Sequence, residues 1–212
     1  MLQGTILASG IFKGVTSRFD TTEKRLFLSL DDGPTEHLTG WILDQLDQYG
    51  AKGTFFCLGS QAERFREQYH AIIDRGHATG NHTHNHLKGW FTGGETYVKD
   101  VIRAGKFIDS ALFRPPHGLI RPSQIYILRE QYHIVLWDVM SGDYRQRATP
   151  EKIIRHVTRR AKPGSVVVFH DSRKAEKNLK EALPMILEYF DSKGYVFLPL
   201  TAELPAQRTL EP

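Results

Sequence analysis

Short apolar runs and amphipathic helical segments alternate about seven times along this chain, and that rhythm restricts the folds it can adopt. Such alternation is typical of a parallel sheet covered by helices, because parallel strands need a long crossover between them. The predicted strands are 26–30, 54–58, 77–79, 112–113, 133–138, 165–169 and 195–198. The predicted helices are 37–49, 60–74, 95–110, 122–131, 149–161 and 174–192. We therefore expect a single α/β domain built on a parallel sheet or barrel.

The composition indicates a globular chain with a mild positive charge. Its 212 residues are 40% hydrophobic and 25% charged, with a net charge of +4, which suits one domain with a sizeable core. The positive charge is not gathered in one long run, so a solvated surface is the favoured interpretation. The alternative is weak attraction to an anionic polymer such as cell-wall glycan or nucleic acid. No module of stacking aromatics and arginines is present, so we predict no nucleic-acid partner.

A single cysteine, Cys57, excludes an intrachain disulfide. It lies in the apolar run 53–58 and is expected to be a small core residue. Residues 1–14 lack the basic start, apolar stretch and cleavage site of a signal peptide. No segment approaches the roughly 18 apolar residues of a membrane-spanning helix. We predict no membrane span, and the compartment stays open.

Polar clusters follow the predicted strands at the point where each strand ends. In a barrel, the carboxyl ends of the strands meet at one edge, where active sites are built. We therefore expect these clusters to gather at a single site. They are Asp31-Asp32, Asn81-His82, Arg114, Asp138 and His170-Asp171.

Two adjacent aspartates and two histidines four residues apart predict a metal site. His82 and His86 can face one ion from a single turn, with His84 pointing elsewhere as an outer-shell or surface residue. Successive strand side chains point to opposite sides, so one of Asp31 and Asp32 can bind the metal while the other reaches the attacking water. Three protein ligands and an open position are what a catalytic zinc-type site requires.

Two further side chains complete the predicted chemistry. Arg114, fixed by the two prolines that follow it, is expected to pair with a carboxylate base and orient it. His170 ends the apolar run 166–169 and is placed to act as a general acid that protonates a leaving group.

These motifs, in this order, resemble the polysaccharide deacetylase family, also called the NodB-homology domain or carbohydrate esterase family 4. The resemblance covers residues 25–200 and leaves 1–24 as an N-terminal extension and 201–212 as a C-terminal tail. It implies a distorted (β/α)7 or (β/α)8 barrel. The matching stretches are Asp31-Asp32-Gly33-Pro34, His82-Thr83-His84-Asn85-His86, Arg114-Pro115-Pro116, Trp137-Asp138 and Phe169-His170-Asp171.

The resemblance also implies a cofactor and its ligands. Asp32, His82 and His86 would bind a divalent metal, most often zinc, with cobalt or nickel as other possibilities. Asp31 would be the general base that deprotonates the attacking water, and Arg114 would hold it.

The other half of the chemistry is implied in the same way. The backbone N–H of His117 would help to bind the oxyanion, and His170 would protonate the departing amine. The reaction would be hydrolysis of an acetamide on an N-acetylated sugar. His117, Tyr144 and Trp137 are candidate contacts of the substrate.

One departure from the family pattern affects the acid histidine. Methionine stands at position 140, where the family often has the aspartate that tunes this histidine. We expect Asp138 to take over that role, or with less support Asp143, because a continuing strand would place Asp138 on the same side as Met140. Mutating Asp138 to Asn should then lower activity.

The leading hypothesis is an N-deacetylase acting on peptidoglycan, a chitin-like polymer or an exopolysaccharide. O-deacetylation of an acetylated polysaccharide is the second, since an alkoxide leaves more easily than an amine and needs less help from an acid. A glycan-binding domain with feeble catalysis is the third, although binding alone requires neither Asp31 nor His170. These substrates suggest the cell envelope or the exterior, and the oligomeric state stays open.

Overall fold

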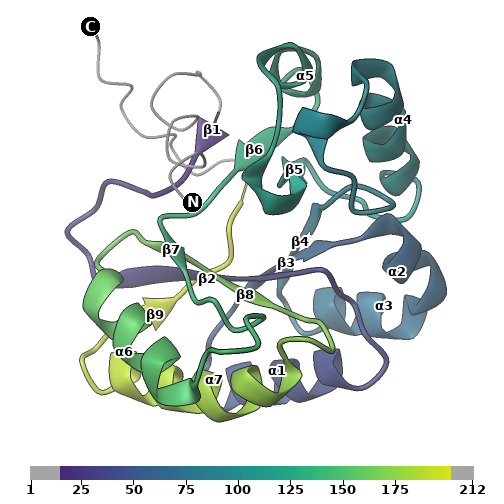
Figure 1. The fold of residues 1–212 in the computed structure, drawn as a ribbon. Coiled ribbons are helices and arrows are strands. Elements are labelled where there is room, and N and C mark those ends of the chain that lie inside the picture. Colours follow the sequence, from purple (N-terminus) through teal and green to yellow (C-terminus); the bar gives the residue numbers. More distant parts are fainter. Residues whose placement is uncertain (1–14, 202–212) are drawn as a thin grey trace, which may run out of the picture.

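The computed structural model describes residues 15–201, and its centre is a curled sheet in which all named strands pair in parallel (Figure 1). The sheet order is β1-β6-β5-β4-β3-β2-β8-β7, with β9 added beside β2. This confirms the α/β class and the distorted barrel expected from the sequence. The strands are β1 (Val15–Thr16), β2 (Arg25–Asp31), β3 (Thr54–Cys57), β4 (Ala78–Asn81), β5 (Leu112–Phe113), β6 (His133–Val135), β7 (Val139–Met140), β8 (Val166–His170) and β9 (Val196–Phe197).

One stretch of chain brings the two ends of the sheet together. β6 pairs with β5, whereas β7, only a few residues later, pairs with β8. The segment 133–140 therefore closes the ring of pairings that runs from β2 through β3, β4 and β5 and returns through β8. β1 pairs with the other side of β6, so residues 15–16 belong to the sheet even though they precede the family resemblance.

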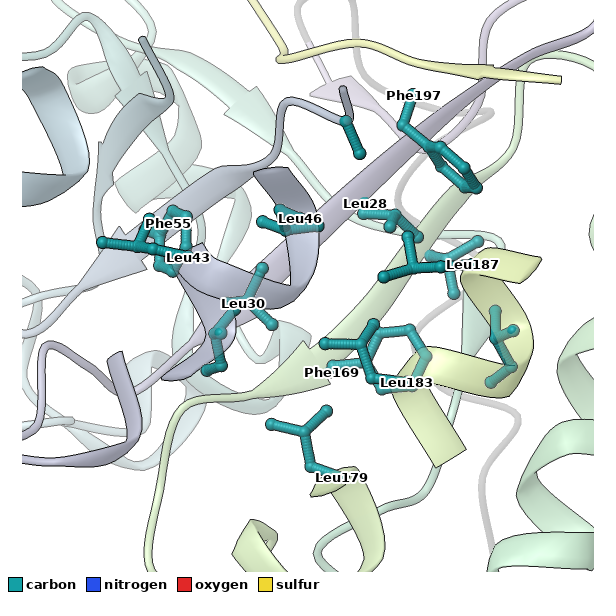
Figure 2. Close-up of a cluster of buried hydrophobic side chains, with 14 of the residues drawn as sticks. Leu28, Leu30, Leu43, Leu46, Phe55, Phe169, Leu179, Leu183, Leu187 and Phe197 are labelled. Carbon is teal, nitrogen blue, oxygen red and sulfur yellow. The ribbon is translucent and has the colours of Figure 1, made fainter. Parts of the chain in front are cut away.

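Helices pack on the outside of the barrel, and a large apolar core lies between them and the strands. Leu28 and Leu30 of β2 and Phe169 of β8 meet Leu183 and Leu187 of α7 in this core (Figure 2). The helices are α1 (Leu38–Gln48), α2 (Gly59–Arg64), α3 (Arg66–Asp74), α4 (Gly94–Ala104), α5 (Pro122–Leu128), α6 (Pro150–Arg160) and α7 (Glu176–Asp191). Two short 3-10 helices, η1 (Gly89–Phe91) and η2 (Pro116–Gly118), lie in the loops that follow β4 and β5.

Strand β2 shows how the sequence separates the core from the site. Its even-numbered residues, such as Leu28 and Leu30, point outward to the helices. By strand alternation its odd-numbered residues point the other way, into the barrel. These include Phe27, packed in a second cluster, and Asp31 at the carboxyl end. An apolar strand therefore delivers a carboxylate to the barrel edge.

Three predicted elements differ from the structure. The helix expected over 60–74 is two helices, because Phe65 leaves the helical region with φ −116° and ψ 60°. The helix expected over 95–110 ends at Ala104, just before Gly105. The strand expected over 133–138 breaks after Val135 and resumes as β7.

Cys57 is fully buried, as predicted. No helix within residues 15–201 has the length and apolar character needed to cross a membrane. The signal-peptide prediction concerned residues 1–14, which lie outside the described residues, as does nearly all of the predicted tail.

Candidate active site

Arg114 is a buried arginine that reaches across the barrel interior to Asp31. It follows β5, is fully buried, and its Nη1 lies 2.7 Å from Asp31 Oδ1 and 2.8 Å from Ser29 Oγ. Its Nε and Nη2 donate to two backbone carbonyl oxygens at the end of β6, at 3.1 and 3.0 Å. The guanidinium also stacks over Phe56 at 3.9 Å. A buried charge is stable only when paired and hydrogen-bonded in this way, so Arg114 fixes the Asp31 carboxylate.

Asp32, His82 and His86 come together at the carboxyl ends of β2 and β4. One ligand atom from each lies within 4.8 Å of the others, and no other such group of three occurs in the described part of the chain. His86 Nε2 is 3.2 Å from Asp32 Oδ1, and His82 Nε2 is 3.7 Å from it. The three residues that the family resemblance implies as metal ligands are therefore brought together.

The hydrogen bonds of this group fit a divalent metal. Asp32 Oδ1 is buried and has no hydrogen-bond partner, which is costly for a carboxylate oxygen unless a cation meets it. His82 Nδ1 lies 2.7 Å from the carbonyl oxygen of Arg114. Because a carbonyl only accepts, Nδ1 carries the proton and Nε2 keeps a free lone pair toward the centre. Two imidazoles and one carboxylate suit zinc, cobalt or nickel.

Charge and burial keep His82 and Asp32 in their metal-binding forms. Burial lowers the pKa of His82 to about 4, so its ring is neutral near pH 7. Burial would raise the pKa of Asp32, but its contact with His86 and the charges of His82 and His170 together hold that pKa below its usual range. A neutral imidazole and an ionised carboxylate are the forms that bind a metal.

The backbone around the ligands is held in an uncommon conformation. Asp32, Thr83 and His86 all have positive φ angles, of 80°, 68° and 57°. Asp100 of α4 secures the histidine loop, because its Oδ2 accepts from the backbone N–H groups of residues 84 and 85 at 2.9 Å each. Its Oδ1 accepts from the Asn85 side chain at 2.6 Å. Asn81 Oδ1 also accepts from the backbone N–H of Thr83 at 2.8 Å. Together these four hydrogen bonds fix the geometry of the histidine loop.

The acid histidine is paired with Asp143. Asp143 Oδ1 lies 2.8 Å from His170 Nδ1, and Asp143 Oδ2 accepts from the His170 backbone N–H at 2.8 Å. Burial works against the charged ring, but the hydrogen bond and charge of Asp143, helped by Asp31 and Asp32, raise the pKa of His170 to about 9. His170 is the register partner of Asp31 on the neighbouring strand, so it faces the same centre.

The expectation that Asp138 tunes His170 is wrong. The Asp138 carboxylate accepts from Ser165 Oγ at 2.7 Å and from the backbone N–H of Val166 at 2.8 Å, at the beginning of β8. His170 ends that strand, roughly 13 Å further along at about 3.3 Å per residue. The alternation argument assumed a strand that continues past Met140. Instead Gly142, with φ 76°, turns the chain and returns Asp143 over the end of β8.

Two of the three predicted substrate contacts, His117 and Tyr144, pack against histidines of the site, whereas Trp137 does not. His117 is exposed with φ 58°, and its ring lies 4.8 Å from that of His86. Its backbone N–H has no hydrogen-bond acceptor among the described residues, which leaves it able to bind an oxyanion. Tyr144 packs edge-on against His170 at 4.7 Å, while Trp137 is half-buried in the core and 5.7 Å from the Arg114 guanidinium.

Sequence reasoning missed one supporting carboxylate, Asp100, and placed another, Asp171, at the site without a role. Asp100 was assigned to an ordinary helix, although it lies one residue before Val101 on the buried face, and a carboxylate there is a signal for a specific partner. Asp171 is buried and accepts from Thr35 Oγ1 at 2.7 Å and from Thr39, which secures the turn after Asp32. His84, expected outside the metal group, lies apart from it, buried against Phe107.

A parallel barrel with carboxylates and histidines gathered at one edge is typical of metal-dependent hydrolases. The family model described as polysaccharide deacetylase matches residues 18–131. A peptidoglycan-N-acetylglucosamine deacetylase of Bacillus cereus is 34% identical over 195 residues, covering 88% of this chain and 91% of that protein. The chain therefore belongs to the polysaccharide deacetylase family, and it is a polysaccharide N-deacetylase.

Solved structures agree with this assignment. A peptidoglycan N-acetylglucosamine deacetylase in complex with 4-naphthalen-1-yl-N-oxidanyl-benzamide superposes with a TM-score of 0.84 at 29% identity, covering 88% of this chain and 91% of that one. A family 4 carbohydrate esterase from Streptomyces lividans in complex with acetate superposes with a TM-score of 0.74 at 26% identity, covering 84% and 93%. The family and fold expected from the sequence are both confirmed.

Proposed function

We propose that this chain removes acetyl groups from the N-acetylglucosamine residues of peptidoglycan, with zinc as its metal. The polymer is supported by the relatives, since the Bacillus cereus protein and the superposing structure are both named peptidoglycan N-acetylglucosamine deacetylases. Peptidoglycan lies in the cell envelope, which we propose as the site of action. Zinc is supported by the ligand set of Asp32, His82 and His86, because two imidazoles and a carboxylate are a common zinc environment.

A metal held by these three residues would polarise the acetyl carbonyl and make a nearby water more acidic. Asp31 takes the proton from the attacking water, and Arg114 holds its carboxylate in position through the 2.7 Å contact. The backbone N–H of His117 donates to the oxygen that gains negative charge. His170 delivers a proton to the sugar nitrogen as the carbon–nitrogen bond breaks, giving acetate and a free amine.

The pairing of His170 with Asp143 is the observation that carries the N-deacetylase function. An amine is a poor leaving group unless it is protonated as it departs, so amide hydrolysis needs a strong general acid. The 2.8 Å contact with Asp143 raises the pKa of His170 to about 9 and keeps the ring charged at neutral pH. O-deacetylation needs less help from an acid, so a histidine with no carboxylate partner at position 140 would favour it. The contact of Asp143 with His170 supplies that carboxylate.

Acetate release from a matched substrate panel tests this function. The panel contains N-acetylglucosamine tetramer, a peptidoglycan fragment and acetylated xylan, each with zinc and with a chelator. We expect zinc-dependent acetate from the two N-acetylated substrates. Acetate from xylan alone would move the function to ester hydrolysis. Binding without release from any of the three, with zinc confirmed in the protein, would support a glycan-binding domain instead.

A further inference from the structure

A basic hollow lies between β7 and α6, beside the loop that carries Asp143. Its volume is about 660 Å³, and its walls include Trp137, Met140 and Ile153. Five basic side chains line it as well: Arg145, Arg147, Lys152, His156 and Arg160. None of them takes part in the chemistry described above.

The chain concentrates its positive charge in this region. Residues 145–162 contain seven lysines and arginines and a single acidic residue, Glu151, a net charge of +6. The whole chain carries only +4, so the remainder is net negative. The sequence contains no uninterrupted basic run here because Thr149, Pro150 and the apolar positions of α6 separate the cations. The fold gathers them by placing Lys152 and Arg160 on one stripe of the helix. His156 lies between them at i, i+4 spacing, and burial together with Arg160 and Arg145 lowers its pKa, so it contributes a polar ring more than a charge.

These cations are not neutralised by the protein. All ion pairs within 4.0 Å among residues 15–201 involve other side chains. One carboxylate, Asp138, lines the hollow, and both of its oxygens accept hydrogen bonds from Ser165 and Val166. Arg145, Arg147, Lys152 and Arg160 are exposed at the wall, and so is His156. Like charges placed together in a concave site attract an anion.

The hollow borders the loop that carries Asp143 to the catalytic edge. Its lining runs from Asp138, which precedes β7, to Gly142 and Arg145, which follow the carboxyl end of that strand. Arg145 packs across Gly142, and its backbone N–H closes a turn on the Gly142 carbonyl at 3.1 Å. Within that turn lie Asp143 and Tyr144, which contact His170. A polymer strand with its acetamide at the centre therefore has a basic wall next to the acid side of the site.

We propose that this basic hollow binds carboxylate groups carried by the glycan substrate near the sugar that is deacetylated. The inference rests on the proposed function, because peptidoglycan carries carboxylates on its lactyl ethers and peptide stems whereas chitin-like oligomers carry none. The hollow acts as a specificity site. It adds affinity for an acidic glycan through charge, and a neutral oligomer passes it without gain.

A matched pair of double variants tests the proposal. The hollow variant is Lys152→Gln with Arg160→Gln, and the control is Arg155→Gln with Arg159→Gln. The control removes the same charge from the same helix, but those two arginines line a different hollow. Glutamine preserves helix propensity. With a carboxylated peptidoglycan fragment, we expect the hollow variant to raise KM about tenfold with kcat retained, and the control to stay near the wild type. With neutral N-acetylglucosamine tetramer, all three proteins should have equal KM.

Equal KM shifts in the hollow and control variants, or a shift on the neutral tetramer as well, would overturn the specificity site while leaving the deacetylase function intact. If no protein releases acetate, the deacetylase function fails. A binding measurement then tests separately whether the hollow binds carboxylates. An oligogalacturonate carries one carboxylate on each sugar and no acetamide, so calorimetry can measure its Kd with the zinc-loaded protein. We expect weaker binding in the hollow variant only. Tighter binding of duplex DNA than of this oligomer would also contradict the proposal.

Discussion

The Arg114 guanidinium and the Asp31 carboxylate form a fully buried ion pair, 2.7 Å apart, inside the barrel. Four acceptors surround the arginine: Asp31, Ser29 and two backbone carbonyl oxygens. A planar guanidinium can meet all four, while a lysine ammonium has a single point of charge. The geometry of the base thus depends on a residue that follows β5, three positions away from β2 in the sheet.

Arg114→Lys should cost both stability and activity. Breaking a buried pair leaves an imperfectly compensated charge, and we expect a loss of about 3 kcal/mol in the free energy of unfolding. Turnover should fall about 100-fold or more, because Asp31 loses its fixed position. Urea unfolding and acetate release measure the two effects. Arg129→Lys is the control, since Arg129 is exposed beside Glu130 and should change stability by no more than about 0.5 kcal/mol.

Asp143→Asn should move the basic limb of the pH profile of kcat. His170 must be protonated to act as an acid, so activity falls as pH rises through its pKa, which Asp143 raises to about 9. Without the carboxylate charge, that limb should appear at lower pH. Asp138→Asn should leave the limb in place because Asp138 contacts Ser165 instead. A limb that moves in Asp138→Asn and not in Asp143→Asn would contradict the geometry.

The pair of His170 and Asp143 should also make the free energy of unfolding depend on pH. The pKa of His170 is raised in the folded protein, so its ion pair with Asp143 contributes fully below about pH 6.5, the unperturbed value. That contribution is lost as pH rises toward about 9. Chemical denaturation between those limits should show wild-type stability falling more steeply with pH than that of Asp143→Asn. Parallel curves for the two proteins would show that the pair contributes nothing.

Asp32→Asn should abolish zinc binding while preserving the fold. Asparagine tolerates the positive φ of 80° at this position, but its amide is a much weaker ligand than a carboxylate. Elemental analysis after dialysis should find zinc in the wild type and none in the variant. His84→Gln is a matched histidine control, since His84 lies outside the ligand group and should keep zinc. Zinc retained by Asp32→Asn would remove this residue from the site.

Asp100→Ala should weaken metal binding from a distance. Asp100 binds two backbone N–H groups and one side chain of the loop between His82 and His86. Loss of an outer partner of this kind commonly lowers metal affinity by about 10- to 100-fold. Competition with a zinc-binding dye measures the change. Lys99→Ala on the same helix, whose only described partner is the exposed Glu95, should leave the affinity unchanged.

The sequence supports prediction of the metal group because its signals are local. Asp32 directly follows an apolar strand, and His82 and His86 lie within one short segment at another strand end, so position and spacing together indicate a shared metal. Their strands are neighbours of β3 in the sheet, which brings the two segments to one edge. The fold followed from the same strand and helix pattern.

Two other relationships depend on tertiary structure. The choice between Asp138 and Asp143 turned on a strand break and on the positive φ of Gly142, neither of which alternation predicts. The role of Asp100 depends on backbone N–H groups of residues 84 and 85 in a separate loop, and such groups have no sequence signature. The basic hollow was missed for a related reason, since its cations are spaced by a helix and do not form a run.

The most direct test of the central claim is acetate release from N-acetylglucosamine tetramer by protein stripped of metal and then titrated with zinc. The account predicts no release from the stripped protein, a rise that saturates when each chain has bound a single zinc ion, and no rise in Asp32→Asn at any zinc concentration. Undiminished release from the stripped wild type, or full activation of Asp32→Asn by zinc, would contradict it.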